Sequence, residues 1–132
     1  MIKVPGRPRG KARPRFHNGH AYTPKNTRDF EQEIRVCYLQ QDGRKLDGSV
    51  SVSIEAIFKI PESWSKKKKW ETIDQGKRPE IRPDIDNIVK IVMDALNGVA
   101  YKDDSQVVDI SARKVYGLGY EGVHITVEEV RA

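Results

Sequence analysis

The run SVSVSIEAIFK, residues 49 to 59, constrains the fold of this chain more than any other segment, because its apolar and polar residues alternate. Successive side chains of an extended strand point to opposite faces, so the alternation predicts a β-strand with one apolar and one polar side. The apolar side comprises Val50, Val52, Ile54, Ala56 and Phe58, and the polar side Ser51, Ser53, Glu55 and Lys59. Other elements must cover the apolar side for such a strand to be stable.

Two segments show the helical period instead. The first begins where Thr23 can cap a helix and Pro24 can be its first residue, and it ends near Gln41. The second covers residues 85 to 97, and Asn97-Gly98 can end it. The apolar stripes are Phe30, Ile34, Cys37 and Tyr38 in the first helix and Ile88, Ile91, Val92, Ala95 and Leu96 in the second.

Three further strands complete the expected fold. Residues 1 to 4 would form a short first strand, and residues 107 to 116 and 122 to 130 would form an antiparallel hairpin across a glycine-rich turn. The order β-α-β-loop-α-β-β predicts an α+β (mixed α/β) fold, with a mixed sheet packed by two helices. At 132 residues the chain is expected to form one domain, residues 1–132, with basic loops at 5–22 and 61–83.

Composition indicates the class of partner. The chain has 24 Lys+Arg against 19 Asp+Glu, a net charge of +5, which favours nucleic acid as a polyanionic partner over a membrane. No apolar run approaches the roughly 20 residues of a membrane span, and the N-terminus lacks the apolar region of a signal peptide. The single Cys37 excludes an internal disulfide. A hydrophobic fraction of only 37% predicts a thin core, or one completed by a second subunit. We therefore expect a soluble intracellular protein.

An acidic island, residues 84 to 109, interrupts the basic chain. Asp84 and Asp86 have an ordinary explanation, since aspartate is favoured at an N-cap and in the first helical turn. Asp86 and Lys90 are four residues apart and so project from one side of the helix, where Lys90 would pair with an acid or contact a phosphate. Asp94 is expected on the helix surface.

The segment after this helix can bring further carboxylates to its start. A helix of about twelve residues rises roughly 18 Å, and the seven residues from 98 to 104 cover a similar distance at about 3.3 Å each. The chain can therefore return Asp103 or Asp104 to the level of Asp84 and Asp86. If the chain runs elsewhere, the same groups would meet across a dimer.

Several aspartates at one place suit a hard divalent cation. Mg²⁺ prefers oxygen ligands and binds through a few carboxylates together with substrate phosphate, and such a site supports phosphodiester hydrolysis. We therefore expect Mg²⁺, with Mn²⁺ as a substitute, at Asp84, Asp86, Asp103 and Asp104. Zinc is not expected, because the close pair His17 and His20 has no cysteine beside it.

The segment RPDIDNIVKIVMDALNGVAYKDDSQVVD, residues 82 to 109, resembles the signature of the RusA-type Holliday-junction resolvases, above all the phage-type members. The resemblance extends to GRPRGKARPRF, AYTPKNTRDFE and SWSKKKKW, although residues 61–83 are longer than in compact bacterial members. It implies a Mg²⁺-dependent endonuclease that acts as a homodimer on four-way DNA junctions. On this resemblance the catalytic aspartates are Asp84, Asp86 and Asp104, and the catalytic lysine is Lys90.

The two basic loops are the expected DNA contacts. Guanidinium groups spaced by glycine and proline can follow a phosphate backbone, although the first loop could also be a disordered solubilising arm. The lysine run in the second loop is either a DNA contact or a solvated face. Trp64 and Trp70 bracket that run and would stack on unpaired bases or anchor the loop to the core. The residues expected to contact DNA are Arg7, Arg9, Lys11, Arg13, Arg15, Lys66, Lys67, Lys68 and Lys69.

The sequence thus predicts a structure-selective DNA endonuclease that resolves four-way junctions by paired symmetric nicks in recombination or repair. We expect it in the cytoplasm, encoded by a bacterium or a phage. The rival interpretation is a non-catalytic protein that binds branched or single-stranded DNA during replication, in which the acids only cap and solubilise a helix. An enzyme acting on flaps or RNA would use the same chemistry.

Overall fold

The alternating segment forms β4 (Val50–Lys59), an inner strand of a four-stranded sheet in the order β1-β6-β4-β5. This computed structural model describes residues 1–131. The other strands are β1 (Ile2–Pro5), β5 (Val107–Gly117) and β6 (Gly122–Glu129). β4 pairs in parallel with β5 and antiparallel with β6, and β6 pairs antiparallel with β1. The predicted mixed sheet is confirmed.

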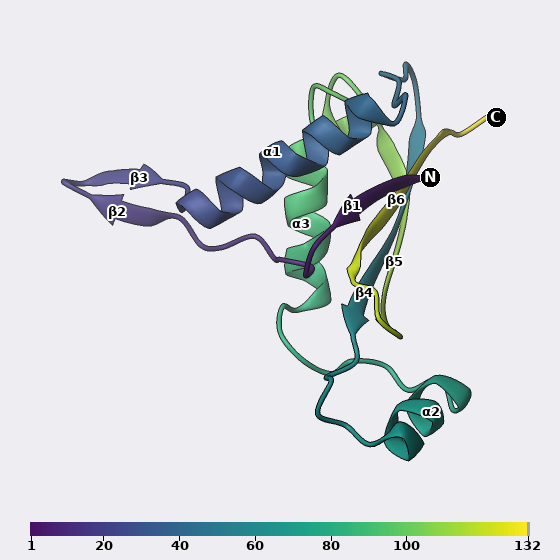
Figure 1. Cartoon of the computed structure of the whole chain (residues 1–132). Helices are drawn as coiled ribbons and strands as arrows, with labels where there is room; N and C mark the ends of the chain where they lie inside the picture. The colour runs from purple at the N-terminus through teal and green to yellow at the C-terminus, as the bar shows by residue number, and fades with distance from the viewer. Residues whose placement is uncertain (132) are drawn as a thin grey trace.

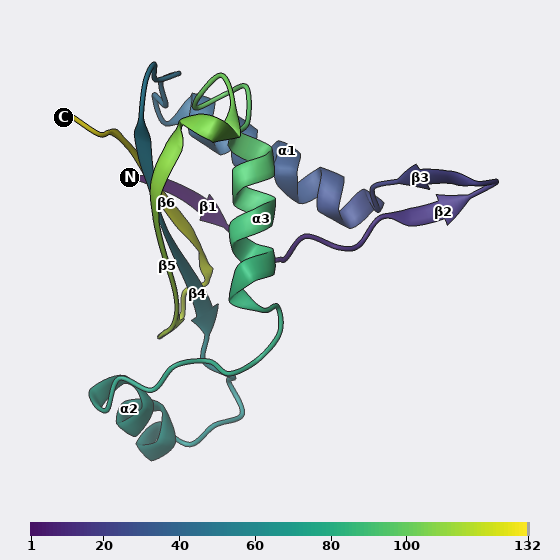
Figure 2. The same cartoon turned by 180° about the vertical axis from the view of Figure 1, so that it is seen from behind.

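Two helices pack on one face of this sheet and leave the opposite face without a helix (Figures 1 and 2). They are α1 (Lys25–Gln40) and α3 (Ile85–Leu96), and the two predicted apolar stripes face the core. α1 begins one residue later than predicted. Its N-cap is Pro24, which has no side-chain donor or acceptor, instead of Thr23. The predicted core position of Cys37 is confirmed.

The prediction that the last two strands form a hairpin is wrong, because β4 lies between β5 and β6. The chain leaves β5 at Gly117, turns through Gly119 at φ 68°, and passes the end of β4 before it enters β6. Ile60 donates its main-chain N–H to the Gly117 oxygen at 3.0 Å and so ties β4 to this turn. The strongly apolar β4 thereby gains a strand on each side, which buries it more fully than an edge position would.

Two segments expected as loops contain regular structure. Within residues 5–22, β2 (Arg15–His17) and β3 (His20–Tyr22) form a two-stranded ribbon that projects from the body, and all six residues are exposed (Figure 1). Asn18 and Gly19 connect the strands with φ of 51° and 78°, as a tight Asn-Gly turn requires. Within residues 61–83, which the sequence predicted as a basic loop, α2 (Lys66–Asp74) is a helix. Ser65 caps α2 by accepting a hydrogen bond from the Lys68 N–H at 3.1 Å.

The direction of α3 positions the candidate site. The segments β4, α3 and β5 form a crossover between parallel strands, so α3 runs antiparallel to both strands. The N-terminus of α3 therefore lies beside the end of β5, and its C-terminus lies beside the start of β5 (Figure 1). Within residues 1–131, no helix has the length and apolar character needed to cross a membrane.

Candidate functional site

Asp84 and Asp86 lie at the N-terminus of α3 with their carboxylates exposed. Asp84 is the N-cap residue, yet its side chain makes no capping hydrogen bond. Only its main-chain oxygen takes part, accepting from the N–H groups of Asn87 and Ile88 at 3.1 and 3.2 Å. The ordinary explanation of Asp84 as a side-chain cap therefore does not hold, and its carboxylate remains available to a ligand.

Basic residues surround Asp84 on both sides. It borders two pockets of about 570 Å³ each, and Arg82 borders both pockets as well. Glu80 also lines the second pocket, but basic residues outnumber the acidic ones around Asp84. A carboxylate in such surroundings is placed to share a ligand that carries both a phosphate and a metal ion. The other basic residues are Arg7, Arg9 and Lys11 in the first pocket and Arg78, Arg113 and Lys114 in the second.

Arg113 and Lys114 were not among the predicted site residues. They occupy neighbouring positions on β5, where they pair with Glu55 and Ala56 of β4. The Lys114 Nζ donates to the Ile81 main-chain oxygen, and Arg78 Nη1 donates to the Lys114 oxygen at 3.1 Å. These bonds hold the segment before α3 against β5. The alternation of residues along β5 could not predict that Arg113 and Lys114 lie near Asp84, because their position depends on which strand lies next to α3.

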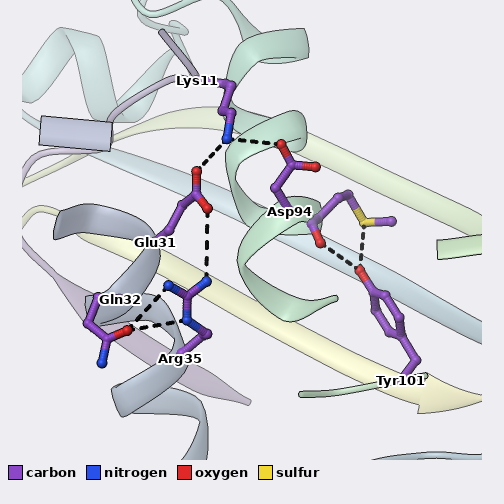
Figure 3. Close-up of polar contacts among 7 residues, drawn as sticks. Lys11, Glu31, Gln32, Arg35, Asp94 and Tyr101 are labelled. Carbon is purple, nitrogen blue, oxygen red and sulfur yellow. Dashed lines mark hydrogen bonds and ion pairs between the residues drawn. The ribbon is translucent and has the colours of Figure 1, made fainter. Parts of the chain in front are cut away.

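Lys11, predicted to contact DNA, borders the first pocket, but its ammonium group is held between carboxylates of α1 and α3 (Figure 3). Its Nζ lies 2.5 Å from the Glu31 carboxylate and 3.2 Å from that of Asp94, and its side chain is only 16% exposed. Burial acts to lower the pKa of Lys11, but the hydrogen bonds to Glu31 and Asp94 outweigh it and raise the pKa. The prediction that Asp94 lies on the helix surface is also corrected, because Asp94 is half-buried and pairs with Lys11.

Lys11 fixes the path of the arginine-rich loop. Its main-chain N–H also donates to the Asn87 oxygen of α3 at 2.9 Å, next to the place where Gly10 packs on Asn87. A β-carbon at Gly10 would lie 2.9 Å from the β-carbons of both Asn87 and Pro83, so this close approach requires glycine. The loop is therefore ordered against α3 up to Ala12, which excludes the alternative of an unstructured arm for this part.

Lys90 is exposed one turn after Asp86 on the same side of α3. None of the ion pairs found between residues 1 and 131 involves Lys90, so the alternative of a simple pair with Asp86 is not supported. Lys90 is therefore exposed to solvent on the side of α3 that also carries Asp86. This position suits contact with a phosphate.

Asp104 lies at the opposite end of α3, near its C-terminus. Burial is the main cause that raises the pKa of Asp104, and the negative charges of Asp103 and Asp94 add to it. Twelve helical residues, about 18 Å, separate this end from Asp84. Among residues 1–131, no group of three His, Cys, Asp or Glu side chains could hold a metal ion. The expected return of Asp103 or Asp104 to Asp84 within one chain is therefore wrong.

The chain cannot take the extended return path because it turns immediately after α3. Gly98, at φ 81°, donates to the Tyr101 oxygen at 2.8 Å, and Leu46 donates to the Ala100 oxygen at 2.8 Å. Asp103 then caps the 3-10 turn η1 (Asp104–Gln106), and its side chain accepts from the Ser105 N–H at 3.0 Å. The hydrogen bonds from the Ser105 side chain and from its main-chain N–H lower the pKa of Asp103 and give that carboxylate a structural role.

The lysine run divides into two pairs. Lys68 lies 3.9 Å above the Trp64 ring, and Lys69 pairs with Glu62 at 3.7 Å. Lys66 and Lys67 are exposed, as are Arg13 and Arg15 near the projecting ribbon. Arg7 likewise lies over the Phe58 ring, 5.4 Å from its centroid. Within residues 1–131, the predicted DNA contacts that form neither an ion pair nor a cation–π contact are Lys66, Lys67, Arg9, Arg13 and Arg15.

Comparisons with known proteins agree with the sequence resemblance. The family model "Endodeoxyribonuclease RusA" matches residues 5–128 of this chain. The "Uncharacterized protein YqaN" of Bacillus subtilis (strain 168) is 39% identical over 132 residues, which cover 96% of this chain and 89% of that protein.

Proposed function

This chain belongs to the RusA endodeoxyribonuclease family, and from that premise we propose that it is a Mg²⁺-dependent endonuclease that resolves four-way DNA junctions by paired, symmetric nicks. The observation that carries the proposal is the exposed, uncapped Asp84 carboxylate between two pockets lined by basic residues. A branched DNA presents closely spaced phosphates to such a surface, and the scissile phosphate would lie at the N-terminus of α3.

The donor set fits Mg²⁺. Asp84 and Asp86 offer carboxylate oxygens at one helix end, and Mg²⁺ binds through one or two carboxylates plus substrate phosphate while retaining several waters. When bound, the ion would polarise the phosphoryl group and make water a stronger nucleophile, and Mn²⁺ would substitute. Arg82 and Arg9 would bind phosphates on either side of the site, and Lys90 would neutralise charge that develops on the scissile phosphate.

We propose that a second copy of the chain supplies the third carboxylate. β5 is an edge strand, and apolar side chains remain exposed along it and on the adjoining side of α3. Val108, Ile110 and Ile85 are 59%, 44% and 41% exposed. Ile110 pairs with the core residue Val52, so it lies on the sheet face that α3 covers. A long edge strand with exposed apolar side chains favours pairing with another strand.

Two-fold pairing of two β5 edges would be antiparallel, which places the start of one β5 beside the end of the other. Asp104 begins η1, which immediately precedes β5, whereas Ala112, Arg113 and Lys114 near the end of β5 line one pocket with Asp84. Each site of the homodimer would then combine Asp84 and Asp86 of one copy with Asp104 of the other. This arrangement would bring the three predicted aspartates together, although Asp84 and Asp104 lie far apart within a single chain.

Cleavage of a synthetic four-way junction tests the function. We expect the wild-type protein to nick opposite strands only when Mg²⁺ or Mn²⁺ is present, and Asp86→Asn to lower the rate at least 100-fold without loss of junction binding. Asp29→Asn, which alters an exposed carboxylate on α1, serves as the matched control. Junction binding without cleavage by the wild-type protein would instead support the rival, non-catalytic interpretation. Wild-type rates for Asp86→Asn would show that the catalytic assignment is wrong.

A further inference from the structure

The α2 platform, residues 61–79, stands apart from the sheet and is nevertheless firmly anchored to it (Figure 1). The Trp64 ring packs edge-on against Tyr116 of β5 with 5.7 Å between centroids. Glu62 pairs with both Lys59 at the end of β4 and Lys69 of α2. At its far end, Arg78 donates to the Lys114 oxygen. The platform is therefore held at both of its connections, so its outer surface has a defined place relative to the site.

The outer surface of α2 presents an aromatic ring beside accessible cations. Trp70 is 66% exposed, although a tryptophan contributes to folding chiefly when it is buried. Lys66 lies one helical turn before Trp70, and Ile73, one turn after it, is 37% exposed. In the described part of the chain neither Lys66 nor Lys67 forms an ion pair. The exposed Trp70 ring and the two unpaired lysines are therefore available to a binding partner.

The charges on α2 indicate an anionic partner. Its first turn contains lysines and no acidic residue, whereas the positive end of a helix favours negative charge. This arrangement weakens the isolated helix and is relieved when an anion binds. An exposed tryptophan next to lysines matches single-stranded nucleic acid, in which bases stack on aromatic rings and phosphates contact cations. Paired bases in an intact duplex do not offer their faces in this way.

The platform is also continuous with the candidate site. Arg78, at the end of the platform, lines the same pocket as Arg82 and Asp84. A strand whose phosphate lies at the N-terminus of α3 can therefore follow these arginines toward α2. Bases near the branch point of a four-way junction are the ones that most readily lose their pairing and stacking within the strand.

We propose that the α2 platform binds an unpaired base next to the branch point of the DNA, with Trp70 stacked on that base and Lys66 and Lys67 on the adjoining phosphates. This inference rests on the proposed function and names the part of the substrate that the protein recognises. It also accounts for the two tryptophans separately: Trp64 anchors the platform, and Trp70 contacts DNA.

Binding measured with the Asp86→Asn protein tests this inference without cleavage. We expect Trp70→Ala to weaken binding of a four-way junction about tenfold and to leave binding of an intact duplex of the same sequence unchanged. Trp70→Phe should restore most of the affinity, because phenylalanine also stacks. Leu39→Ala, which removes another exposed apolar side chain on α1, should bind like the parent protein. Unchanged junction affinity for Trp70→Ala, or an equal loss on the duplex, would overturn the inference.

A spectroscopic measurement gives a second, independent reading. In Trp64→Phe, which keeps an aromatic ring against Tyr116, Trp70 is the remaining tryptophan. Stacking on a base should quench its fluorescence when a junction or single-stranded DNA is added, and the duplex should quench it much less. Equal fluorescence with and without the junction would contradict stacking. Failure of the proposed function would be seen separately, as an absence of Mg²⁺-dependent nicking by the wild-type protein.

Discussion

The Tyr101 hydroxyl donates a hydrogen bond to the main-chain oxygen of Met93 at 3.0 Å, which joins the segment after α3 to the last turn of that helix (Figure 3). Tyr101 is fully buried, so the contact is fixed by packing as well as by the hydrogen bond. Because the chain is held at this point, Asp104 begins η1, the turn that leads into β5, beside the C-terminus of α3. The separation of Asp104 from Asp84 is therefore a consequence of buried contacts. In the proposed homodimer, Asp104 of the second copy would complete each site instead.

Mixing two inactive variants distinguishes a site shared between copies from a site within one chain. In a heterodimer of Asp86→Asn and Asp104→Asn, a shared arrangement puts both substitutions in one site and leaves the other intact. We expect the mixed protein to nick one strand of a junction, whereas each variant alone stays inactive. If every site belonged to one chain, both sites of the heterodimer would carry a substitution, and the mixture would be inactive. Cleavage assays after joint refolding of the two variants make this measurement.

Metal binding also distinguishes a site shared between copies from a site within one chain, and its measurement does not depend on cleavage. Calorimetric titration with Mn²⁺ should show about half the wild-type number of high-affinity sites in the mixed dimer. An unchanged affinity in Asp104→Asn alone would contradict a role for Asp104 as a ligand.

Replacement of Lys11 should affect stability more than DNA contact. Lys11→Met removes the cation between Glu31 and Asp94, whose carboxylates are partly buried, and we expect a loss of about 1–3 kcal/mol in the free energy of unfolding. Arg9→Met removes an exposed cation from the same loop and should change stability by less than about 0.5 kcal/mol while weakening DNA binding. Urea denaturation of both variants checks the difference. Equal stabilities would show that the ion pairs around Lys11 contribute nothing.

The salt dependence of junction binding should identify the accessible cations. Each phosphate contact that is lost lowers the slope of log K against log salt by about 0.9. We expect this decrease for Arg9→Gln and for Arg82→Gln, which line the pockets around Asp84. Lys69→Gln should leave the slope nearly unchanged, because Lys69 already pairs with Glu62. A decrease for Lys69→Gln as large as for Arg9→Gln would contradict this assignment.

His124 should make part of the stability depend on pH. Burial lowers the pKa of His124 below its ordinary value of 6.5, and the charges of Glu55 and Lys3 act on it in opposite directions. Its ring also lies 3.1 Å from the Tyr120 hydroxyl on the open face of the sheet. Because the unfolded imidazole binds a proton more readily than the folded one, this contribution to stability is present above about pH 6.5 and is lost as the pH falls.

The difference in unfolding free energy between the wild-type protein and His124→Gln measures this effect. Between pH 7.5 and pH 5, the free energy of unfolding of the wild-type protein should fall relative to that of His124→Gln. A difference that stays constant across this range would contradict the lowered pKa of His124.

Local sequence patterns by themselves determined the long elements of the core of this protein. The alternation from Val50 to Phe58 predicted β4 and its buried side, and the stripe from Ile88 to Leu96 predicted α3, because each pattern follows from the geometry of one element. The same reasoning placed Asp84 and Asp86 at a helix start. The Asn18-Gly19 turn carried a readable hairpin signal as well, and with it the ribbon of β2 and β3 could have been predicted.

Only the tertiary structure decided how these elements and their charges are combined. The position of β4 between β5 and β6, the enclosure of Lys11 by Glu31 and Asp94, and the fixed turn at Tyr101 all depend on contacts between distant segments. A periodic pattern states which side of an element is buried, but many pairings satisfy that condition equally well. Packing selects one of them, and in doing so it placed Asp104 at the end of α3 remote from Asp84.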